Sequence, residues 1–405
     1  MLVDGTGALP VLPDLQADHD GHALADVLAL VGGDIPLAPT ARLADGGFVH
    51  LVGMRGGAPD GAFVAPDALA DPGHAAVVAH AIAELDPGRS PALRPAWFRP
   101  GWFDLVEAWI DAVLAPSGRR RTGPVEPFRL WSISAVVRVP TDDGELWCKA
   151  SCEHFRREAS IHAAVERLLP DLVPRLVAIE RDEGWLLMEP MAGTEPGAQA
   201  AGTAVEVAQR WAAAQLDAIE HVPALLAAGL EHRGADETIA AFLRLLASSA
   251  ELALLTDAEL ADVRASADRA VALTRACWEA GVPETLAHGD LHLGNVAWDG
   301  RALRIFDWTD GCVSHPFLDA THLTRFADDA SASAAEAVYA AVWRAAHPDV
   351  DVDRALRLAP LADLVFQTVT FEAIAAATEQ QSAWELGGVV ARNLRLLPGL
   401  VAEVG

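Results

Sequence analysis

The carboxyl-terminal half of this 405-residue chain has a helical pattern with one interruption, at residues 284–311. This interruption constrains the possible fold more than any other feature of the sequence. This stretch, ETLAHGDLHLGNVAWDGRALRIFDWTDG, contains short strand-like runs and several glycines, whereas almost everything else after residue 198 has helical periodicity. Irregular backbone held by a rigid scaffold is where binding and catalytic residues tend to lie. We therefore expect the chemistry of this chain in that segment.

An alternating, β-branched pattern that begins at residue 128 predicts a small sheet. FRLWSISAVVRVP predicts a strand, a tight turn and a second strand, and GELWCKAS predicts a third. A helix is expected over about 153–169 and should end at Pro170, because proline cannot continue a helix. VPRLVAIE and GWLLMEP predict two further strands, and MAGTEPGA predicts a loop.

Residues 1–125 predict an additional α/β unit without a chemical motif. GGFVHLVGM and GAFVAPDAL are typical of short strands, and PGHAAVVAHAIAEL and GWFDLVEAWIDAVLA are typical of helices. APSGRRRTGPVEP has the composition of a linker. We therefore expect three parts: the unit of unknown role at 1–125, a sheet lobe at 126–192 and a helical lobe at 193–405.

Charge and apolar patterning limit the classes of protein to consider. The formal net charge is −27, which argues against a nucleic-acid partner because such a partner requires a basic footprint. No apolar run reaches the roughly 18 residues that span a bilayer, and the first residues lack the pattern of a signal peptide. We expect a cytoplasmic protein without a membrane partner. The four cysteines have no metal-binding spacing and are expected to be reduced, although a thiol role for Cys148 or Cys152 stays open.

Lys149 is the only lysine in the chain, beside 29 arginines among the 30 basic residues. Lysine is a compact point charge and arginine is a planar fork, so the two are not interchangeable. Either the site at Lys149 needs a small ammonium group, or one lysine has been left by chance on a strand. This stretch alone does not decide between the two.

Three oxygen-bearing side chains can converge in the interrupting stretch. Asp290 and Asn295 lie five residues apart in HGDLHLGN, and Asp307 follows the strand-like LRIF. With water and phosphate, such oxygens are the ligands that Mg²⁺ takes, and an aspartate not needed by the metal could orient a hydroxyl nucleophile. Alone, each could be ordinary turn chemistry, and His288 an ordinary hydrogen-bonded residue. The combination at this spacing favours a site.

These motifs resemble the aminoglycoside phosphotransferase and choline kinase-like family of the protein-kinase-like fold. HGDLHLGN resembles the family's catalytic loop, and IFDWTD resembles its metal-binding segment. SHPFLDATHL resembles the stretch that follows, with Asp319 as the matching aspartate. The resemblance covers roughly residues 128–405. It implies an α+β, two-lobed fold, in which a small β-sheet lobe accompanies a larger helical lobe, and it makes His288 and Asp319 structural residues near the site.

The resemblance also implies ATP and Mg²⁺ as cofactors. Asp290 would be the catalytic base that positions the acceptor hydroxyl, and Asn295 and Asp307 would hold Mg²⁺ against the phosphates. Lys149 would bind the α- and β-phosphates.

Glu158 would pair with Lys149 from the predicted helix. The helix pattern agrees with this pairing. Glu158 shares a helix face with Ile161, Val165 and Leu168, and a carboxylate on such an apolar face is costly unless it is paired. In LMEPM, at 187–191, the backbone groups of Glu189 and Met191 would meet the adenine.

One departure from the family pattern concerns the phosphate loop. Protein kinases cover the phosphates with a glycine-rich loop, whereas the matching turn here is WSISA, without glycine. The hydroxyls of Ser132 and Ser134 and nearby backbone N–H groups could face phosphate instead. The missing glycines support an alternative, a non-catalytic nucleotide-binding regulatory module with the same fold.

The sequence thus predicts a small-molecule kinase that transfers the γ-phosphoryl group of ATP to a hydroxyl of an aminoglycoside, amino-alcohol, sugar or similar compound. No APE-type activation segment follows Asp307, which favours a small acceptor over a protein. Four acidic residues could line a pocket for a cationic acceptor, or could be ordinary solvated residues: Asp310, Glu372, Glu379 and Glu385. The pattern does not indicate the oligomeric state.

Overall fold

The computed structural model describes residues 2–3, 35–42, 48–53, 62–63, 65–69, 71–191, 202–325 and 327–405. The chain divides into two compact units, and each is described by itself. Unit 1 comprises Met1–Arg156, Asp182–Met188 and Ala375–Gly387, and unit 2 comprises Arg157–Arg181, Glu189–Ile374 and Gly388–Gly405. These divisions fall at other residues than 125 and 192, and the three-part organisation stays a prediction.

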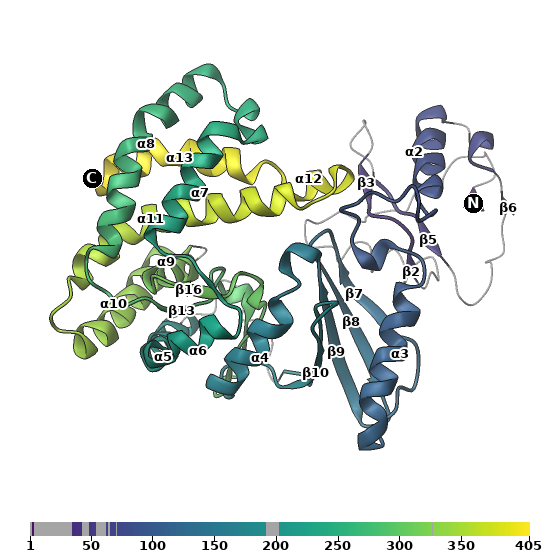
Figure 1. Ribbon diagram of the computed structural model, residues 1–405, viewed down its shortest axis with the longest axis horizontal. Helices are drawn as coiled ribbons and strands as arrows, with labels where there is room; N and C mark the ends of the chain where they lie inside the picture. Colours follow the sequence, from purple (N-terminus) through teal and green to yellow (C-terminus); the bar gives the residue numbers. More distant parts are fainter. Residues whose placement is uncertain are drawn as a thin grey trace. The chain divides into compact units, whose positions relative to one another are not determined.

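Antiparallel strands form the centre of unit 1 (Figure 1). The predicted strands are present as β7 (Glu126–Leu130), β8 (Ser134–Thr141), β9 (Gly144–Ser151) and β11 (Trp185–Met188), and β11, β9, β8 and β7 lie side by side in that order. In the register of these strands, Lys149 of β9 lies opposite Val136 of β8 and Leu186 of β11. Side chains at paired positions lie on the same face of the sheet. The predicted tight turn therefore lies at residues 131–133.

Two helices predicted in the first 125 residues are present in unit 1. They are α2 (Pro72–Ala83), which Asp71 caps through the N–H groups of Gly73 and His74, and α3 (Trp102–Leu114). The indole rings of Trp102 and Trp109 on α3 contact that of Trp185 on β11, with centroids 6.2 and 5.6 Å apart. Helix α3 and the strands therefore share one apolar core.

Short elements complete unit 1. The strands pair as β1 (Leu2–Val3) with β6 (Ala62–Phe63), β2 (Ile35–Pro36) with β5 (Val52–Gly53), and β3 (Ala41–Arg42) with β4 (Phe48–Val49). The 3₁₀ turns are η1 (Pro66–Ala68), η2 (Ala96–Phe98), η3 (Ala115–Ser117), η4 (Glu153–Phe155) and η9 (Gln380–Ser382), and a one-turn helix, α12 (Ala383–Leu386), follows η9.

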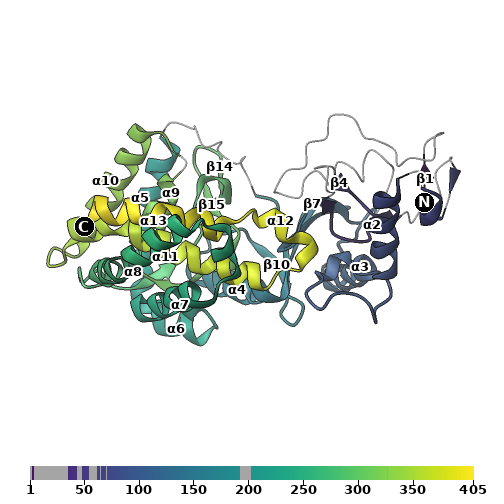
Figure 2. The same cartoon turned by 90° about the horizontal axis from the view of Figure 1, so that it is seen from above.

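Unit 2 is mainly helical, as predicted. It begins with α4 (Glu158–Leu168), which starts later than expected because η4 precedes it, and β10 (Leu176–Glu180). The remaining helices are α5 (Thr203–Ala218), α6 (Val222–Ala227), α7 (Ala235–Ser248), α8 (Asp257–Trp278), α9 (Phe317–Thr324), α10 (Asp329–Ala346), α11 (Val352–Ala376, whose last two residues fall in unit 1) and α13 (Val389–Val404), with turns η5 (Ile219–His221) and η6 (Ala250–Leu254). Figures 1 and 2 show α5, α9 and α10 packed together, and α8 packed against α7 and α13.

The predicted interruption forms two small sheets inside this helical scaffold. β13 (Thr285–Ala287) pairs with β16 (Cys312–Ser314), which also pairs with β12 (Glu231–His232), and β14 (Val296–Trp298) forms a hairpin with β15 (Leu303–Ile305). The turns η7 (Leu293–Asn295) and η8 (Trp308–Asp310) connect them. Each short strand is therefore followed by an irregular segment that can hold functional side chains.

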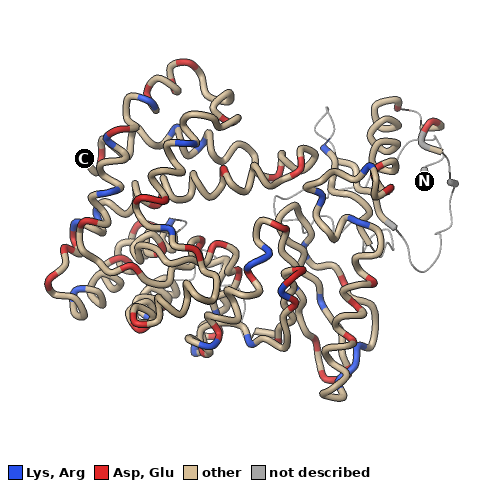
Figure 3. The backbone as a smooth tube through the Cα atoms, viewed as in Figure 1, with Lys and Arg blue, Asp and Glu red and all other residues tan. Residues whose placement is uncertain are grey.

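Helix α11 is, by length and composition alone, apolar enough to cross a membrane. Within the structure 67% of its most apolar window is buried, as in a core helix. Acidic residues are dispersed over the elements of each unit rather than gathered on one helix (Figure 3).

Candidate active site

The loop that follows β13 is fixed by one buried carboxylate. Asp319, on α9, accepts hydrogen bonds from the backbone N–H groups of His288 at 2.8 Å and Gly289 at 2.9 Å. The side chains of Trp211 and Gln215 on α5 donate to the same carboxylate at 2.9 and 3.1 Å. Burial raises the pKa of Asp319 to about 6, and the bonds donated by His288, Gly289 and Trp211 limit the rise. Asp319 therefore ties the loop to the helices behind it.

Gly289 occupies a position in this loop that suits only glycine. Its φ is +82°, and a Cβ atom there would lie 2.6 Å from the carbonyl oxygen of Asp310. The Gln367 side chain of α11 donates to the Gly289 carbonyl at 2.6 Å. The sharp turn brings the loop against η8, and the side chain of Asp290 follows directly.

His288 connects the loop to the neighbouring hairpin. The ring is buried, with Nε2 3.0 Å from the carbonyl oxygen of Phe306 and Nδ1 3.3 Å from the backbone nitrogen of Asp290. These partners assign the neutral ring with a proton on Nε2, which donates to Phe306, while Nδ1 accepts from Asp290. Burial lowers the pKa of His288 to about 4, so the ring stays neutral near pH 7.

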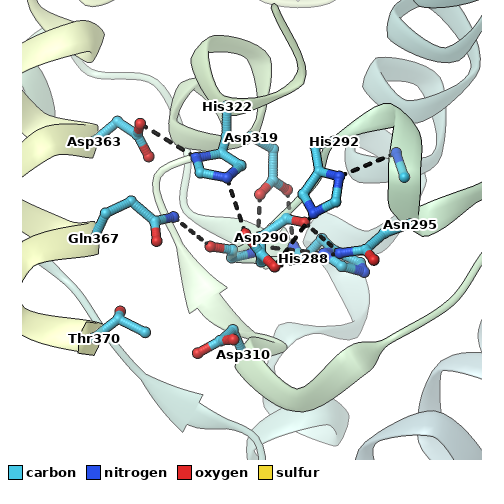
Figure 4. Close-up of polar contacts among 12 residues, drawn as sticks. His288, Asp290, His292, Asn295, Asp310, Asp319, His322, Asp363, Gln367 and Thr370 are labelled. Atoms are coloured by element: carbon cyan, nitrogen blue, oxygen red, sulfur yellow. Dashed lines mark hydrogen bonds and ion pairs between the residues drawn. The ribbon is translucent and has the colours of Figure 1, made fainter. Parts of the chain in front are cut away.

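Asp290 presents a carboxylate that is partly open to solvent and held by several neighbours (Figure 4). Asn295 Nδ2 donates to the carbonyl oxygen of Asp290 at 2.9 Å and to its Oδ2 at 3.3 Å. His322 Nε2 lies 2.9 Å from Oδ1, and His292 Nε2 lies 3.7 Å from Oδ2. Burial raises the pKa of Asp290, but the hydrogen bond and charge of His322 outweigh it and lower the pKa overall. Asp290 is therefore ionised at neutral pH.

The hairpin β14–β15 brings Asn295 and Asp307 to the same end of one element. Val296 pairs with Ile305, and the N–H of Phe306 donates to the carbonyl oxygen of Asn295 at 3.0 Å. Asp307 adopts a left-handed conformation, with φ of 66°, and no other non-glycine residue does so in the part of the chain that the structure describes. Such strained backbone tends to persist at functional sites, where the surroundings enforce it.

This pair of residues fits a magnesium ion by its chemistry. The amide nitrogen of Asn295 is used by Asp290, which leaves the amide oxygen as the group that a cation would meet. Asp307 supplies a carboxylate, of which Oδ1 accepts a hydrogen bond from Thr309 at 3.1 Å. Among the described residues no three of His, Cys, Asp and Glu form a metal cluster, but Mg²⁺ held with nucleotide phosphates needs only one or two carboxylates.

Glu158 is buried in unit 2 and contacts the segment that carries Asp307. Its Oε1 accepts a hydrogen bond from the backbone N–H of Trp308 at 3.1 Å. The carboxylate on the apolar stripe of α4 therefore has a partner that the sequence did not indicate. The pairing of Glu158 with Lys149 stays a prediction.

Lys149 lies near the end of β9 in unit 1 and is buried, with 6% of its surface exposed. A charged amine is rarely so buried without a partner, which argues against a chance surface lysine. In the turn before β8, Ser134 Oγ accepts a hydrogen bond from the Trp131 indole at 2.7 Å. Ser132 Oγ is buried and has no hydrogen-bond partner among the described residues. Ser134 is therefore engaged in the turn, whereas the Ser132 side chain lies beside the Glu385 carboxylate and lowers its pKa.

The backbone of this turn already donates a hydrogen bond to an acidic side chain. The N–H of Ser132 donates to the carboxylate of Glu385 on α12 at 2.9 Å. Burial raises the pKa of Glu385 to about 7, and the hydrogen bonds of Ser132 oppose the rise. Trp384 Nε1 donates to the carbonyl oxygen of Thr40, and Glu379 binds Arg94 Nε through both oxygens at 2.9 Å. The segment that carries Glu385 is thus held within unit 1.

Glu189 and Met191 follow β11 and lie at the start of the second segment of unit 2, Glu189–Ile374. The N–H of Glu189 donates to the carbonyl oxygen of Arg175 at 3.0 Å, so its carbonyl rather than its N–H would be the group to meet an adenine. The residues after Met191 in the predicted loop lie outside the described residues.

Comparison with known proteins decides the family. The model of the phosphotransferase enzyme family matches residues 126–356, more than half of the chain. The chain belongs to the phosphotransferase enzyme family. The match starts where β7 starts, and it includes the HGDLHLGN loop and Asp307 but not the first 125 residues.

Solved structures support the fold of this phosphotransferase family member. The GDP and kanamycin complex of APH(2")-IIIa matches with a TM-score of 0.54, 16% identity, and coverage of 73% of this chain and 98% of that one. The GDP complex of wild-type aminoglycoside 2'-phosphotransferase-IIIa gives a TM-score of 0.52 at 16% identity, with coverage of 73% and 98%. A choline/ethanolamine kinase family protein from Mesorhizobium loti gives 0.48 at 16%, with coverage of 74% and 98%. No curated protein matches. At these identities the first two likenesses establish a kinase-like α+β fold, as predicted.

The predicted acidic pocket receives little support. Asp310 lies beside the loop, where burial, followed by the charges of Asp290 and Asp307, raises its pKa to about 7. The three glutamates have other partners: Ser249 for Glu372, Arg94 for Glu379 and Ser132 for Glu385. Glu379 and Glu385 belong to unit 1, whereas Asp310 belongs to unit 2.

Sequence reasoning missed two residues of interest, His322 and Asp363, and it missed the partner of Glu385. His322 follows Asp319 by three positions on α9, so the two share a helix face, and that spacing was a usable signal. Neither Asp363 nor the contact of Glu385 with Ser132 had a local signal, because each of these residues meets its partner across a long stretch of chain.

Proposed function

We propose that the protein is an ATP- and Mg²⁺-dependent phosphotransferase that moves the γ-phosphoryl group to a hydroxyl of a small molecule. The observation that carries the proposal is the Asp290 carboxylate, ionised, partly exposed, and fixed beside Asn295 and the Asp307 hairpin. Phosphoryl transfer needs little covalent chemistry from the protein, so positioning and charge neutralisation account for most of the catalysis.

Each residue would have one task. Asp290 would accept a hydrogen bond from the acceptor hydroxyl and orient its oxygen toward the phosphoryl group. Asn295 and Asp307 would hold Mg²⁺, which when bound neutralises phosphate charge. Asp319, Gln367 and Gly289 would keep the loop in one conformation through the hydrogen bonds described above.

Nucleotide binding would involve the further residues that the sequence predicts. Lys149 would bind the α- and β-phosphates, and the turn with Ser132 and Ser134 would face phosphate. Glu158 and the backbone of Glu189 and Met191 would complete the nucleotide site. A nucleotide-dependent enzyme of this kind agrees with the predicted cytoplasmic location.

The proposal is tested by nucleotide consumption. Purified protein is supplied with ATP and Mg²⁺ and a panel of aminoglycosides, macrolides, amino-alcohols and sugars, and ADP release is followed. We expect acceptor-dependent ADP release that requires Mg²⁺. ATP titrations with and without Mg²⁺ complete the test, and equal affinity in both would remove Asn295 and Asp307 from a metal site.

One observation favours the alternative, a nucleotide-binding module without catalysis. The Ser132 N–H is occupied by the Glu385 carboxylate, in a turn that already lacks glycine. A module of this kind would bind ATP and release no ADP with any acceptor. The ionised Asp290 argues against it, because a binding module has no need for an exposed carboxylate beside nucleotide phosphates.

A further inference from the structure

His322 is held between two carboxylates in the interior of unit 2 (Figure 4). Its Nε2 lies 2.9 Å from Asp290 Oδ1, and its Nδ1 lies 3.5 Å from Asp363 Oδ2 on α11. The side chains of His322 and Asp363 are 5% and 6% exposed, whereas that of Asp290 is 35% exposed. The histidine therefore joins the accessible carboxylate of the site to one that solvent does not reach.

The geometry favours a protonated ring. Both ring nitrogens face carboxylate oxygens, and only the imidazolium form can donate from both. The second oxygen of Asp363 is buried and has no hydrogen-bond partner among the described residues, so a negative charge there would be costly without a nearby cation. His322 also lies in the last turn of α9, where the helix dipole favours a positive charge.

Some of the other groups around His322 favour the charged form of its ring, and others disfavour it. Burial disfavours the charged ring, and the His292 ring is 6.2 Å away. Asp363, Asp290 and, on the same helix, Asp319 favour it. The attraction of Asp363 and Asp290 exceeds the effect of burial and raises the pKa of His322 to about 10.

We propose that His322, held by Asp363, is a positioning residue that fixes the rotation of the Asp290 carboxylate and leaves Oδ2 to face the acceptor hydroxyl. The inference rests on the proposed function, in which Asp290 orients that hydroxyl. His322 occupies Oδ1 from the interior, so the remaining oxygen is the one near Asn295 Nδ2, at 3.3 Å. Asp319, three residues earlier on the same helix, holds the backbone of the same loop, so α9 fixes both the loop and its carboxylate.

The expected consequence is a loss of turnover rather than of nucleotide affinity. A carboxylate free to rotate spends part of its time with neither oxygen in place, and a misplacement of about 1 Å can cost on the order of 10²-fold in rate. His322→Leu is expected to lower kcat by about 10- to 100-fold and to leave KM for MgATP within about twofold. His322→Gln keeps one donor toward Asp290 and is expected to recover part of the rate. His221→Leu, at a half-exposed histidine elsewhere in unit 2, is the control.

A second readout needs no acceptor. In full-length protein labelled with ¹⁵N-histidine, His322 is identified as the signal that His322→Gln lacks, and its ring is titrated from pH 6 to 8.5. We expect an imidazolium throughout this range in the wild type. Removing either charge, by Asp363→Asn or Asp290→Asn, is expected to bring the titration of His322 into that range.

The experiments distinguish a failure of this inference from a failure of the proposed function. A neutral His322 ring at pH 7.5 in the wild type would overturn the inference, and so would wild-type kcat in His322→Leu. If no acceptor is phosphorylated, the proposed function fails, and the NMR comparison still decides the link between the two residues. A His322 titration that is the same in the wild type and in Asp290→Asn would then overturn it.

Discussion

Single residues around the loop show how one small region shifts the pKa values of neighbouring carboxylates in opposite directions. The pKa of Asp290 is lowered by His322, whereas burial raises that of Asp310 to about 7 and that of Asp319 to about 6. The difference follows from the partners, because Asp290 faces a cation and Asp319 faces neutral donors. Environments that separate the pKa values of neighbouring acids are typical of active sites. Asp290 is the carboxylate prepared to act as an anion.

Replacing Asp290 tests its role directly. Asp290→Asn keeps the size of the side chain and removes the charge, so we expect nucleotide affinity to change little. Turnover should fall by about 10²- to 10⁴-fold, which is the usual contribution of a positioned general base. The measurement is kcat by ADP release beside Kd for MgATP by calorimetry. Unchanged turnover would remove Asp290 from the mechanism.

Asp310 should make stability depend on pH. Its pKa in the folded protein, about 7, lies above the ordinary value of 3.8, so its contribution to stability is present at low pH and is lost as the pH rises through about 7. Asp310→Asn removes the buried charge. We expect the variant to melt a few degrees above the wild type at pH 8, roughly 2–4 °C for each kcal/mol, and to show a smaller difference at pH 5. Calorimetry that finds the same difference at both pH values would contradict this.

Among the elements, those with a local pattern could be predicted from the sequence. Alternation predicted β7, β8 and β9, and glycines among short strands predicted the interruption that became β13–β16. The loop HGDLHLGN could be assigned because its spacing is itself the signal. Contacts made at long range could not be assigned, since nothing near Glu385 in the sequence indicates that it meets Ser132, 253 residues away. The partner of Glu158 was missed for the same reason, because the Trp308 N–H lies 150 residues on.

The element formed by η9 and α12 should compete with nucleotide phosphate. A carboxylate on a backbone N–H occupies the kind of position that a phosphate would take. At pH 8 Glu385 is mainly ionised, because its pKa is about 7, and at pH 6 it is mainly neutral. We expect Glu385→Gln to bind MgATP up to about tenfold tighter than the wild type at pH 8, with the two converging at pH 6.

Calorimetric titration of the wild type and Glu385→Gln at both pH values measures this effect, with Glu403→Gln on the exposed surface of α13 as the control. Comparing variants at each pH removes the contribution of the titration of ATP itself. An affinity in Glu385→Gln equal to or weaker than that of the wild type at pH 8 would make the contact purely structural.

At the scale of the whole chain, the open question is whether residues 1–125 fold apart from the family region that begins at 126. Composition alone predicts a separate unit joined by a linker. Contacts within unit 1 favour the opposite. Trp102 and Trp109 of α3 pack on Trp185 of β11, and the Trp97 indole donates to the Trp131 carbonyl at 2.9 Å. The linker-like stretch is itself held in place. The Arg121 side chain donates two 2.8 Å hydrogen bonds to Asp111, and the Arg121 backbone forms an isolated antiparallel β-bridge with Thr141.

Limited trypsin digestion can decide between these expectations, because the stretch contains Arg119, Arg120 and Arg121 as adjacent cleavage sites. An exposed turn at Arg301 provides an internal reference. We expect cleavage at 119–121 to be slower than at Arg301, because a protease needs an extended, unpaired segment. We also expect the two pieces of nicked protein to elute together in gel filtration, because separating them would expose Trp185 and the rest of the core shared with α3. A folded fragment that starts near residue 122, elutes alone and melts at the temperature of the intact protein would instead establish residues 1–125 as an independent unit.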